Sequence, residues 1–148
     1  MRLSAKSRYA LAATIHMAQS SNKNEYITLI SISDKLDISK IYLEQVFSLL
    51  KRGNIVNSIK GSQGGYQLAR DPKHITVYDI LSSVETSLFE STEETIKDRA
   101  PEIEAALTTA VYAPLDEAVK VMLMQVSLFD LVSEAERQKP DQGYMFFI

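Results

Sequence analysis

Glu44 and Gln45, adjacent in the segment 39–52, have side chains suited to recognising the edges of DNA bases. A glutamine amide can form two hydrogen bonds with adenine, and a glutamate carboxylate can accept one from the N4 amino group of cytosine. An ion pair with Lys40 on the same helix is the alternative role for Glu44, and such a pair contributes only about a few tenths of a kcal/mol. Both roles of Glu44 are kept as hypotheses.

Side chains suited to contacting a sugar–phosphate backbone lie on either side of this pair in the sequence. Cations and hydroxyl groups in such places position a duplex without specifying its sequence. Lys60 and Gly61 belong to a glycine-rich segment that would approach the minor groove, where a cation is favoured at narrow A·T-rich steps. The candidate DNA contacts are Lys6, Arg8, Tyr9, Ser39, Lys40, Tyr42, Glu44, Gln45, Lys60 and Gly61.

The charge of the chain is divided unevenly between its two halves. Residues 1–74 contain eleven Lys and Arg against five Asp and Glu, whereas residues 75–148 contain five against fourteen. The whole chain of 148 residues has a formal net charge of −3, which conceals a basic N-terminal half. A basic half favours a polyanionic partner such as DNA, with chance variation of surface charge as the alternative.

Residues for catalysis or for holding a metal are not apparent in the sequence. The chain has no cysteine, which excludes disulfides, thiolate zinc sites and iron–sulfur ligation by cysteine. Neither His16 nor His74 has a nucleophile or a second metal ligand at a recognisable spacing, and we expect them in the core and at the surface, respectively. The sequence therefore predicts no enzyme, no metal and no cofactor.

Apolar periodicity predicts three helices that would carry most of the candidate DNA contacts. They cover residues 4–19, 28–36 and 39–52, and the last two begin at residues that cap helices well, Thr28 and Ser39. A gap of about two residues between the second and third helices predicts a helix-turn-helix. The third helix would turn four apolar residues toward the core: Leu43, Val46, Phe47 and Leu50.

A β-hairpin is predicted directly after the helix-turn-helix. Residues 55–60 and 66–70 have strand-like composition, and three of the five glycines lie between them. A hairpin in this place is the wing of a winged helix. Residues 26–27 are expected to be extended, and a capping box of Thr76 with Asp79 predicts a fourth helix that runs to about residue 86.

The acidic half is predicted to be helical and to contain the surface for dimerisation. Residues 93–109 are weakly amphipathic and are expected to be interrupted at Pro101, while Pro114 is expected to begin the next helix. A second capping box, Ser127 with Asp130, predicts a last helix. The apolar stripe of the helix after Pro114 would pack on a second copy, with folding back on its own domain as the alternative; its residues are Leu115, Val119, Met122 and Val126.

Three segments of the chain resemble the Rrf-two family of bacterial dimeric winged-helix repressors. They are Ser-Ala-Lys-Ser-Arg-Tyr-Ala at 4–10, Ser-Lys-Ile-Tyr-Leu-Glu-Gln-Val-Phe at 39–47, and Lys-Gly-Ser-Gln-Gly-Gly-Tyr-Gln-Leu-Ala-Arg at 60–70. The resemblance covers residues 1–86 closely, and residues 127–131 are similar to the segment that follows the family's dimerisation helix. It implies that Tyr42, Glu44 and Gln45 take part in DNA recognition.

The resemblance departs from part of the family at residues 87–113. Members that sense iron–sulfur status or nitric oxide hold a cluster through three cysteines in the corresponding region, and this chain has none. The end of the chain, Gly-Tyr-Met-Phe-Phe-Ile at 143–148, is similar to that of a cluster-free branch of the family that represses cysteine metabolism together with a cysteine synthase (O-acetylserine thiol-lyase). The resemblance thus implies that the same enzyme is a partner here.

The terminal residues also suit a partner on physical grounds. An aromatic run that ends in a free carboxylate can enter a concave site, where the rings supply burial and the carboxylate fixes the orientation. The alternative is that the tail packs on its own dimer. The residues concerned are Tyr144, Phe146, Phe147 and Ile148.

The sequence as a whole predicts a mainly α protein with a small β-hairpin, in which a winged helix-turn-helix domain is followed by a long C-terminal dimerisation helix. We expect the DNA-binding domain at residues 1–86, an acidic dimerisation region at 87–138 and a tail at 139–148. The predicted function is that of a cytoplasmic, homodimeric repressor that binds a palindromic operator, without a membrane-spanning segment. Control by a small ligand, or use of the winged helix as a protein–protein adaptor, are the alternatives.

Overall fold

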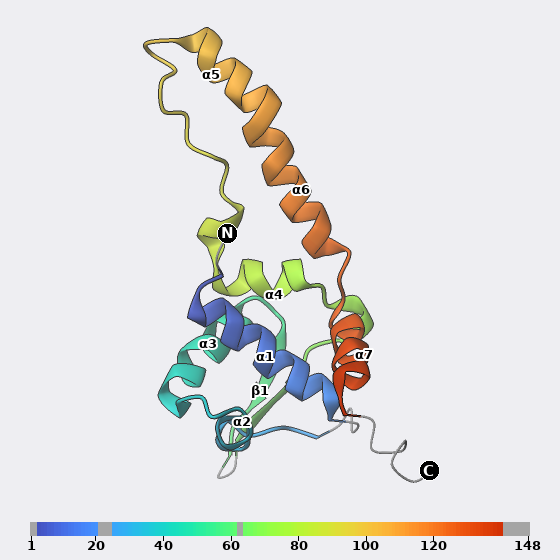
Figure 1. Cartoon of the computed structure of the whole chain (residues 1–148). Helices are drawn as coiled ribbons and strands as arrows, with labels where there is room; N and C mark the ends of the chain where they lie inside the picture. Colours follow the sequence, from blue (N-terminus) through green and yellow to red (C-terminus); the bar gives the residue numbers. More distant parts are fainter. Residues whose placement is uncertain (1–2, 21–24, 62–63, 141–148) are drawn as a thin grey trace, which may run out of the picture.

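Three helices pack around one core at the N-terminal end of the computed structural model, which describes residues 3–20, 25–61 and 64–140 (Figure 1). They are α1 (Ala5–Gln19), α2 (Leu29–Leu36) and α3 (Lys40–Arg52). Each begins at a hydroxyl side chain that accepts a hydrogen bond from the amide three residues later, and these caps are Ser4, Thr28 and Ser39. The three predicted helices are confirmed.

A tight turn joins α2 to α3 and produces the helix-turn-helix. Asp37, at the C-terminus of α2, adopts a left-handed backbone conformation with φ of 54°, which reverses the chain within a few residues. Ile38 follows and is buried. On α3, the four residues predicted to face the core are all fully buried, so the opposite side of this helix is directed away from the domain.

The predicted wing is present as two antiparallel strands. β1 (Val56–Ile59) pairs with β2 (Gly65–Leu68), with Val56 opposite Leu68. Ile27 forms an isolated bridge with Tyr66, so the short extended stretch at residues 26–27 joins the hairpin as expected. Gly65 has a φ of +151°, and a Cβ there would lie 3.0 Å from the Cβ of Tyr26, so the close approach requires glycine.

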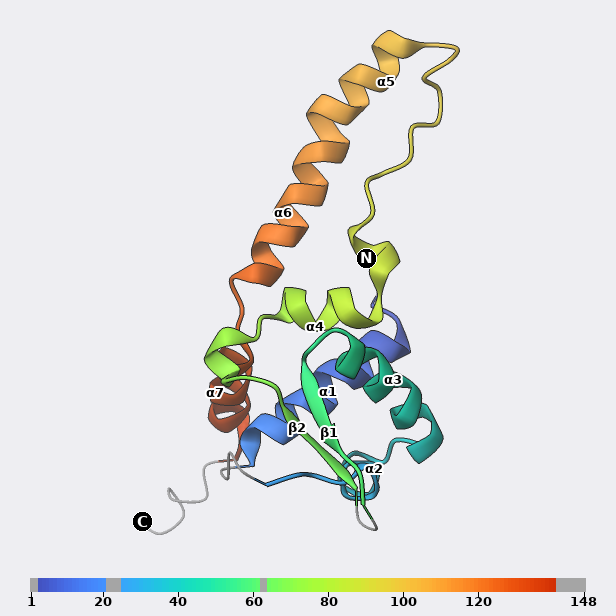
Figure 2. The same cartoon turned by 180° about the vertical axis from the view of Figure 1, so that it is seen from behind.

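The chain leaves the winged domain for the arm, a projecting segment formed by residues 91–124, and then returns to it. α4 (Val77–Val84) is followed by the 3₁₀ helix η2 (Thr86–Phe89), and after the arm α7 (Leu128–Gln138) packs on α1 and on η1 (Pro72–His74) (Figure 2). Both predicted capping boxes are confirmed, and their first residues, Thr76 and Ser127, form a β-bridge with each other. This bridge fixes the returning end of the arm to the start of α4.

The arm consists of an extended segment and a long helix that runs back beside it (Figure 1). The helix contains α5 (Pro101–Leu107), a π-helical turn η3 (Thr108–Tyr112) and α6 (Ala113–Met124) in direct succession. None of the helices among the described residues is long and apolar enough to cross a membrane.

The predicted helix at residues 93–109 is wrong in its first half. Residues 91–100 are not helical, and Pro101 begins α5 instead of interrupting a helix. The carboxylate of Glu104 accepts hydrogen bonds from the amides of Thr95 and Ile96, both at 3.1 Å, and so holds the preceding segment against the first turns of α5. Proline suits the first turn because its missing N–H would have no partner there.

Pro114 stands within one residue of the start of a helix, as expected, but no break separates that helix from the preceding one. It lies near the start of α6, which continues directly from the π-helical turn. In a regular α-helix a proline ring clashes with the carbonyl group four residues earlier. The wider turn at Thr108–Tyr112 precedes the proline and accommodates it, so the helix continues where an interruption was expected.

Gly53 gives a first testable prediction, because it lies against α4. A Cβ at Gly53 would lie 2.0 Å from Oγ and 2.6 Å from Cβ of Ser83. Gly53→Ala is expected to lower the free energy of unfolding by about 1–3 kcal/mol, as overpacking does, measured by urea denaturation. Gly53→Ala combined with Ser83→Gly should recover most of the loss. Equal losses in the single and the double variant would contradict this contact.

Candidate nucleic-acid interface

The outer side of α3 presents the residues expected to recognise bases. Glu44, Gln45 and Ser48 are exposed, and Ile41 has 71% of its surface exposed. These four residues, together with Leu49, line a shallow hollow on the helix surface. A helix with one fully buried face and an opposite face of this composition has the form of a recognition helix, which enters the major groove by its N-terminal part.

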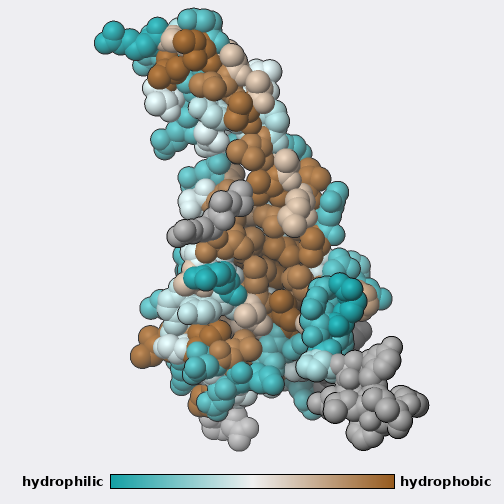
Figure 3. Space-filling view, in the orientation of Figure 1, coloured by the Kyte–Doolittle hydropathy of each residue, from teal (hydrophilic) through white to brown (hydrophobic). Residues whose placement is uncertain are grey.

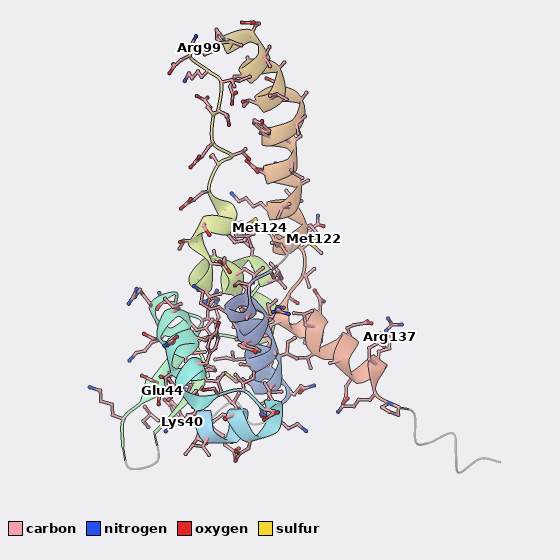
Figure 4. All side chains as sticks on the ribbon, turned by 60° about the vertical axis from the view of Figure 1, so that its left-hand side comes forward. Lys40, Glu44, Arg99, Met122, Met124 and Arg137 are labelled. Atoms are coloured by element: carbon pink, nitrogen blue, oxygen red, sulfur yellow. The ribbon has the colours of Figure 1, made fainter. Side chains whose placement is uncertain are left out.

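Lys40 and Glu44 form the ion pair expected under the alternative role of Glu44, with 3.8 Å between Nζ and Oε1 (Figure 4). Their side chains are 52% and 55% exposed, respectively, so water screens the pair and its net contribution is about 0–1 kcal/mol. Such a pair orients Glu44 on the helix surface, but little free energy is lost when the Glu44 carboxylate leaves Lys40 for another partner. Its contact with a base remains a prediction.

Two tyrosines connect the N-terminal parts of α1 and α3. The rings of Tyr9 and Tyr42 meet edge to face, with 5.1 Å between their centroids. Arg8, next to Tyr9, is exposed, whereas Lys6 is half-buried. The structure therefore brings Tyr9 and Tyr42 together as one surface, with Arg8 beside it.

The wing and the helix-turn-helix enclose a second hollow that contains two of the predicted cations. It is lined by Lys40 from the start of α3, by Lys60 from the wing, and by Thr28, Leu29 and Ile30 from the start of α2. Gly61 has a φ of +154°, and apart from its chain neighbours no atom of the described residues lies within 4 Å of the position of a Cβ. Ile30 is 57% exposed here, and sequence reasoning missed this contribution of α2.

Glu85 connects α4 to the first turn of α1. The hydroxyl groups of Ser4 and Ser7 both donate hydrogen bonds to its Oε2 atom, that of Ser7 at 2.7 Å. These bonds lower the pKa of Glu85, with a smaller contribution from the charge of Lys6. The charge of Lys6 thus acts on this carboxylate. Sequence reasoning missed the arrangement of Glu85 with Ser4 and Ser7.

The lowered pKa of Glu85 makes stability depend on pH. Because ionisation is favoured in the folded state, the stabilisation is complete above the pKa of the unfolded chain and is lost as the pH falls through the lower, folded pKa. Glu85→Gln is expected to reduce the loss of stability between neutral and acidic pH, measured as urea midpoints. Ser7→Ala should act in the same direction and Ser87→Ala, at an exposed position nearby, should not. An unchanged pH profile in Glu85→Gln would contradict the role.

Neither His16 nor His74 lines the two hollows described above. Burial, followed by the charge of Lys35, lowers the pKa of His16, which is half-buried in α1, and His74 is exposed. Across the described part of the chain, no group of three or more His, Asp or Glu is placed to hold a metal ion.

A family model described as "Rrf2: Iron-dependent Transcriptional regulator" matches residues 3–134. The chain belongs to the Rrf-two family. "HTH-type transcriptional regulator IscR" of Xenorhabdus nematophila is 36% identical over 136 residues, which cover 92% of this chain and 82% of that protein. The IscR of Cereibacter sphaeroides is 33% identical over 99% of this chain and 96% of its own.

Solved structures of the Rrf-two family share the fold of this protein. CymR, the global cysteine regulator of B. subtilis, has a TM-score of 0.73 and 32% identity over 90% of this chain and 98% of that one. The IscR of T. potens has a TM-score of 0.74 and 29% identity over 99% and 97% of the two chains. The winged-helix prediction is thereby confirmed, and the protein is a transcriptional regulator and not an enzyme.

The family description names iron, but this chain cannot hold an iron–sulfur cluster through thiolate ligands. The sequence contains no cysteine, so no iron–sulfur cluster can be bound through cysteine sulfur. In the arm, Thr95 and Ile96 instead donate their amides to the buried carboxylate of Glu104, an arrangement that needs no metal.

Proposed function

We propose that this Rrf-two regulator is a homodimer that represses genes by binding a palindromic operator. The observation that carries the proposal is the exposed face of α3 beside the hollow containing Lys40 and Lys60, which presents base-recognising and phosphate-binding groups on adjacent surfaces. Phosphate contacts are proposed for Lys6, Arg8, Tyr9, Ser39 and Tyr42, and minor-groove contacts for Lys60 and Gly61.

An exposed apolar surface on the arm supports the proposal that the protein forms a homodimer. Leu115 and Met122 are 53% and 56% exposed, and Figure 3 shows a continuous apolar band along α5 and α6. Val119 is only partly exposed, because α6 packs on α4 at its base. Val126 was predicted in the same helical stripe but lies beyond the end of α6, where its carbonyl accepts a hydrogen bond from the amide of Val77 at 2.9 Å. The apolar surface is wider than the predicted stripe, since Ile103, Val111, Val121 and Met124 are exposed as well. Apolar patches of this extent are typical of an interface.

The test is to incubate the purified protein with sheared genomic DNA from its source and to sequence the retained fragments. Enriched fragments that share a palindrome would support the dimeric regulator, and the neighbouring genes would identify its targets. If roughly six phosphates are neutralised per subunit, the affinity should fall by several powers of ten from low to moderate salt. No enrichment in any salt would favour the adaptor function instead.

We further propose that the targets belong to cysteine or sulfur metabolism and that a cysteine synthase controls the regulator. The likeness to CymR, named a global cysteine regulator, and the absence of cysteine ligands for a cluster support this assignment. The proposed contact residues, Tyr144, Phe146, Phe147 and Ile148, lie outside the described residues. Unchanged binding of cysteine synthase after deletion of residues 145–148 would refute the role of the tail.

The remaining assignments follow from this function. We propose that residues 1–86 form the DNA-binding domain, residues 87–138 the dimerisation region and residues 139–148 the tail. A protein that binds an operator in a bacterium acts in the cytoplasm.

A further inference from the structure

A hollow of about 410 Å³ lies where the arm joins the winged domain. Its wall is formed by Tyr78 of α4, by residues 88–92, which lead into the arm, and by residues of the long helix between Thr108 and Lys120. A volume of this size is within the range of about 300–1,000 Å³ that is usual for small-molecule sites. The hollow is separate from the surfaces proposed to bind DNA, whereas Leu115 and Val119 belong both to its wall and to the predicted dimerisation stripe.

Three aromatic rings belong to this wall, and one of them already holds a positive charge. The rings of Tyr78 and Phe89 are 4.7 Å apart between centroids, and Tyr112 lines the same hollow. The Nζ atom of Lys120 lies 5.7 Å from the centroid of the Tyr78 ring. A cation over an aromatic face is stabilised by the ring's electrons, so the chain's own ammonium group marks a place that favours positive charge.

The charges around the rings favour a cationic occupant over an anionic one. Glu90, Asp116 and Glu117 line the hollow, with Lys120 as the one cation among its lining residues. Asp116 also accepts hydrogen bonds from the amide and the hydroxyl group of Thr92, at 3.3 and 3.2 Å, which connects the two sides of the arm at this level. An anion would meet an excess of carboxylates here.

The π-helical turn contributes directly to the same hollow. Thr108 and Tyr112, its first and last residues, are both lining residues. Such turns are rare and occur frequently at functional sites, because the wider turn changes the direction of the side chains that follow. The irregular backbone, the aromatic wall and the charge thus coincide in one place.

We propose that this hollow binds a small organic ammonium compound with an aromatic or apolar body. Because the Tyr78 ring already holds Lys120, the ammonium group would lie near Tyr112 and Glu117, and the body against Leu88 and Ala113. The wall continues through η2 to Glu85, which holds Ser4 and Ser7 at the start of α1, so occupancy is connected to the helix that carries Arg8 and Tyr9. A role of the compound as an effector of DNA binding rests on the proposed function.

Tyramine and 3-(4-hydroxyphenyl)propionate are suitable probes, because they share one aromatic body and differ in the sign of their charge. Binding to the full-length protein is measured by calorimetry and by the shift in Tm, without DNA, so this test can fail independently of the proposed function. Tyramine is expected to bind and to raise Tm, and the propionate is not. Glu117→Gln and Tyr112→Leu should each weaken tyramine roughly tenfold.

Glu102→Gln is the matched control, since Glu102 is an exposed glutamate on α5 outside the hollow. It should bind tyramine as the unaltered protein does. The Tm of each variant without a probe shows whether it is folded, and the two cavity variants address the site independently. Equal binding of the two probes, no binding of tyramine, or undiminished binding in both cavity variants would overturn the proposal.

Discussion

Met122→Asp is expected to convert the regulator into monomers and thereby to abolish tight operator binding. Met122 lies near the end of α6 with 56% of its surface exposed, so an aspartate there is solvated in the single chain and leaves its fold intact (Figure 4). In the proposed dimer the same carboxylate would be buried without a partner in both copies. An unpaired charge at an interface costs several kcal/mol, or on the order of a hundredfold to a thousandfold in dimer affinity.

Sedimentation velocity over a range of concentrations measures this effect. Operator binding should weaken in parallel, because a monomer binds only one half-site and loses the coupling between the two. Ser133→Asp is the control, because Ser133 is exposed on α7 and the substitution introduces the same charge. A Met122→Asp protein that sediments like the unaltered one would show that α6 does not form the interface.

The elements that were predicted correctly depend on interactions between close neighbours in the sequence. The cap of α3 by Ser39 and the capping box of Thr76 with Asp79 connect residues three apart, and residue types alone indicate them. The same holds for the buried face of α3. Because these local signals are strong, the helix-turn-helix and the side of α3 that presents Gln45 could be predicted before the fold was known.

The features that were missed depend on contacts between distant segments. Glu104 is 3% exposed, because its carboxylate binds amides of the segment before α5, yet in an acidic sequence it resembles any solvent-facing glutamate. Glu85 is likewise 78 and 81 residues from its partners Ser7 and Ser4. A proline within a helical pattern either interrupts the helix or begins a new one in its first turn, and Pro101 begins α5, where Glu104 holds the preceding segment.

Gln45→Ala is expected to remove most of the sequence specificity of DNA binding. Gln45 is exposed on the outer face of α3 and is adjacent to Glu44, whose carboxylate pairs with Lys40. A bidentate amide–base contact contributes about 1–3 kcal/mol of discrimination, and a dimer would lose it in both half-sites. Operator affinity should therefore fall at least roughly thirtyfold, whereas binding to unrelated DNA, which depends on phosphates, should change little.

The measurement is a titration of operator and unrelated duplexes at one fixed salt concentration, because affinities at different salt concentrations cannot be compared. Gln19→Ala, at an exposed position at the end of α1, is the matched control and should retain both affinities. Glu44→Ala separates the two roles of Glu44. A change in the preferred base at one operator position would assign it to recognition, whereas a uniform small change would assign it to the ion pair with Lys40. Equal loss on both duplexes in Gln45→Ala would place Gln45 among the backbone contacts and leave base recognition to its neighbours on α3.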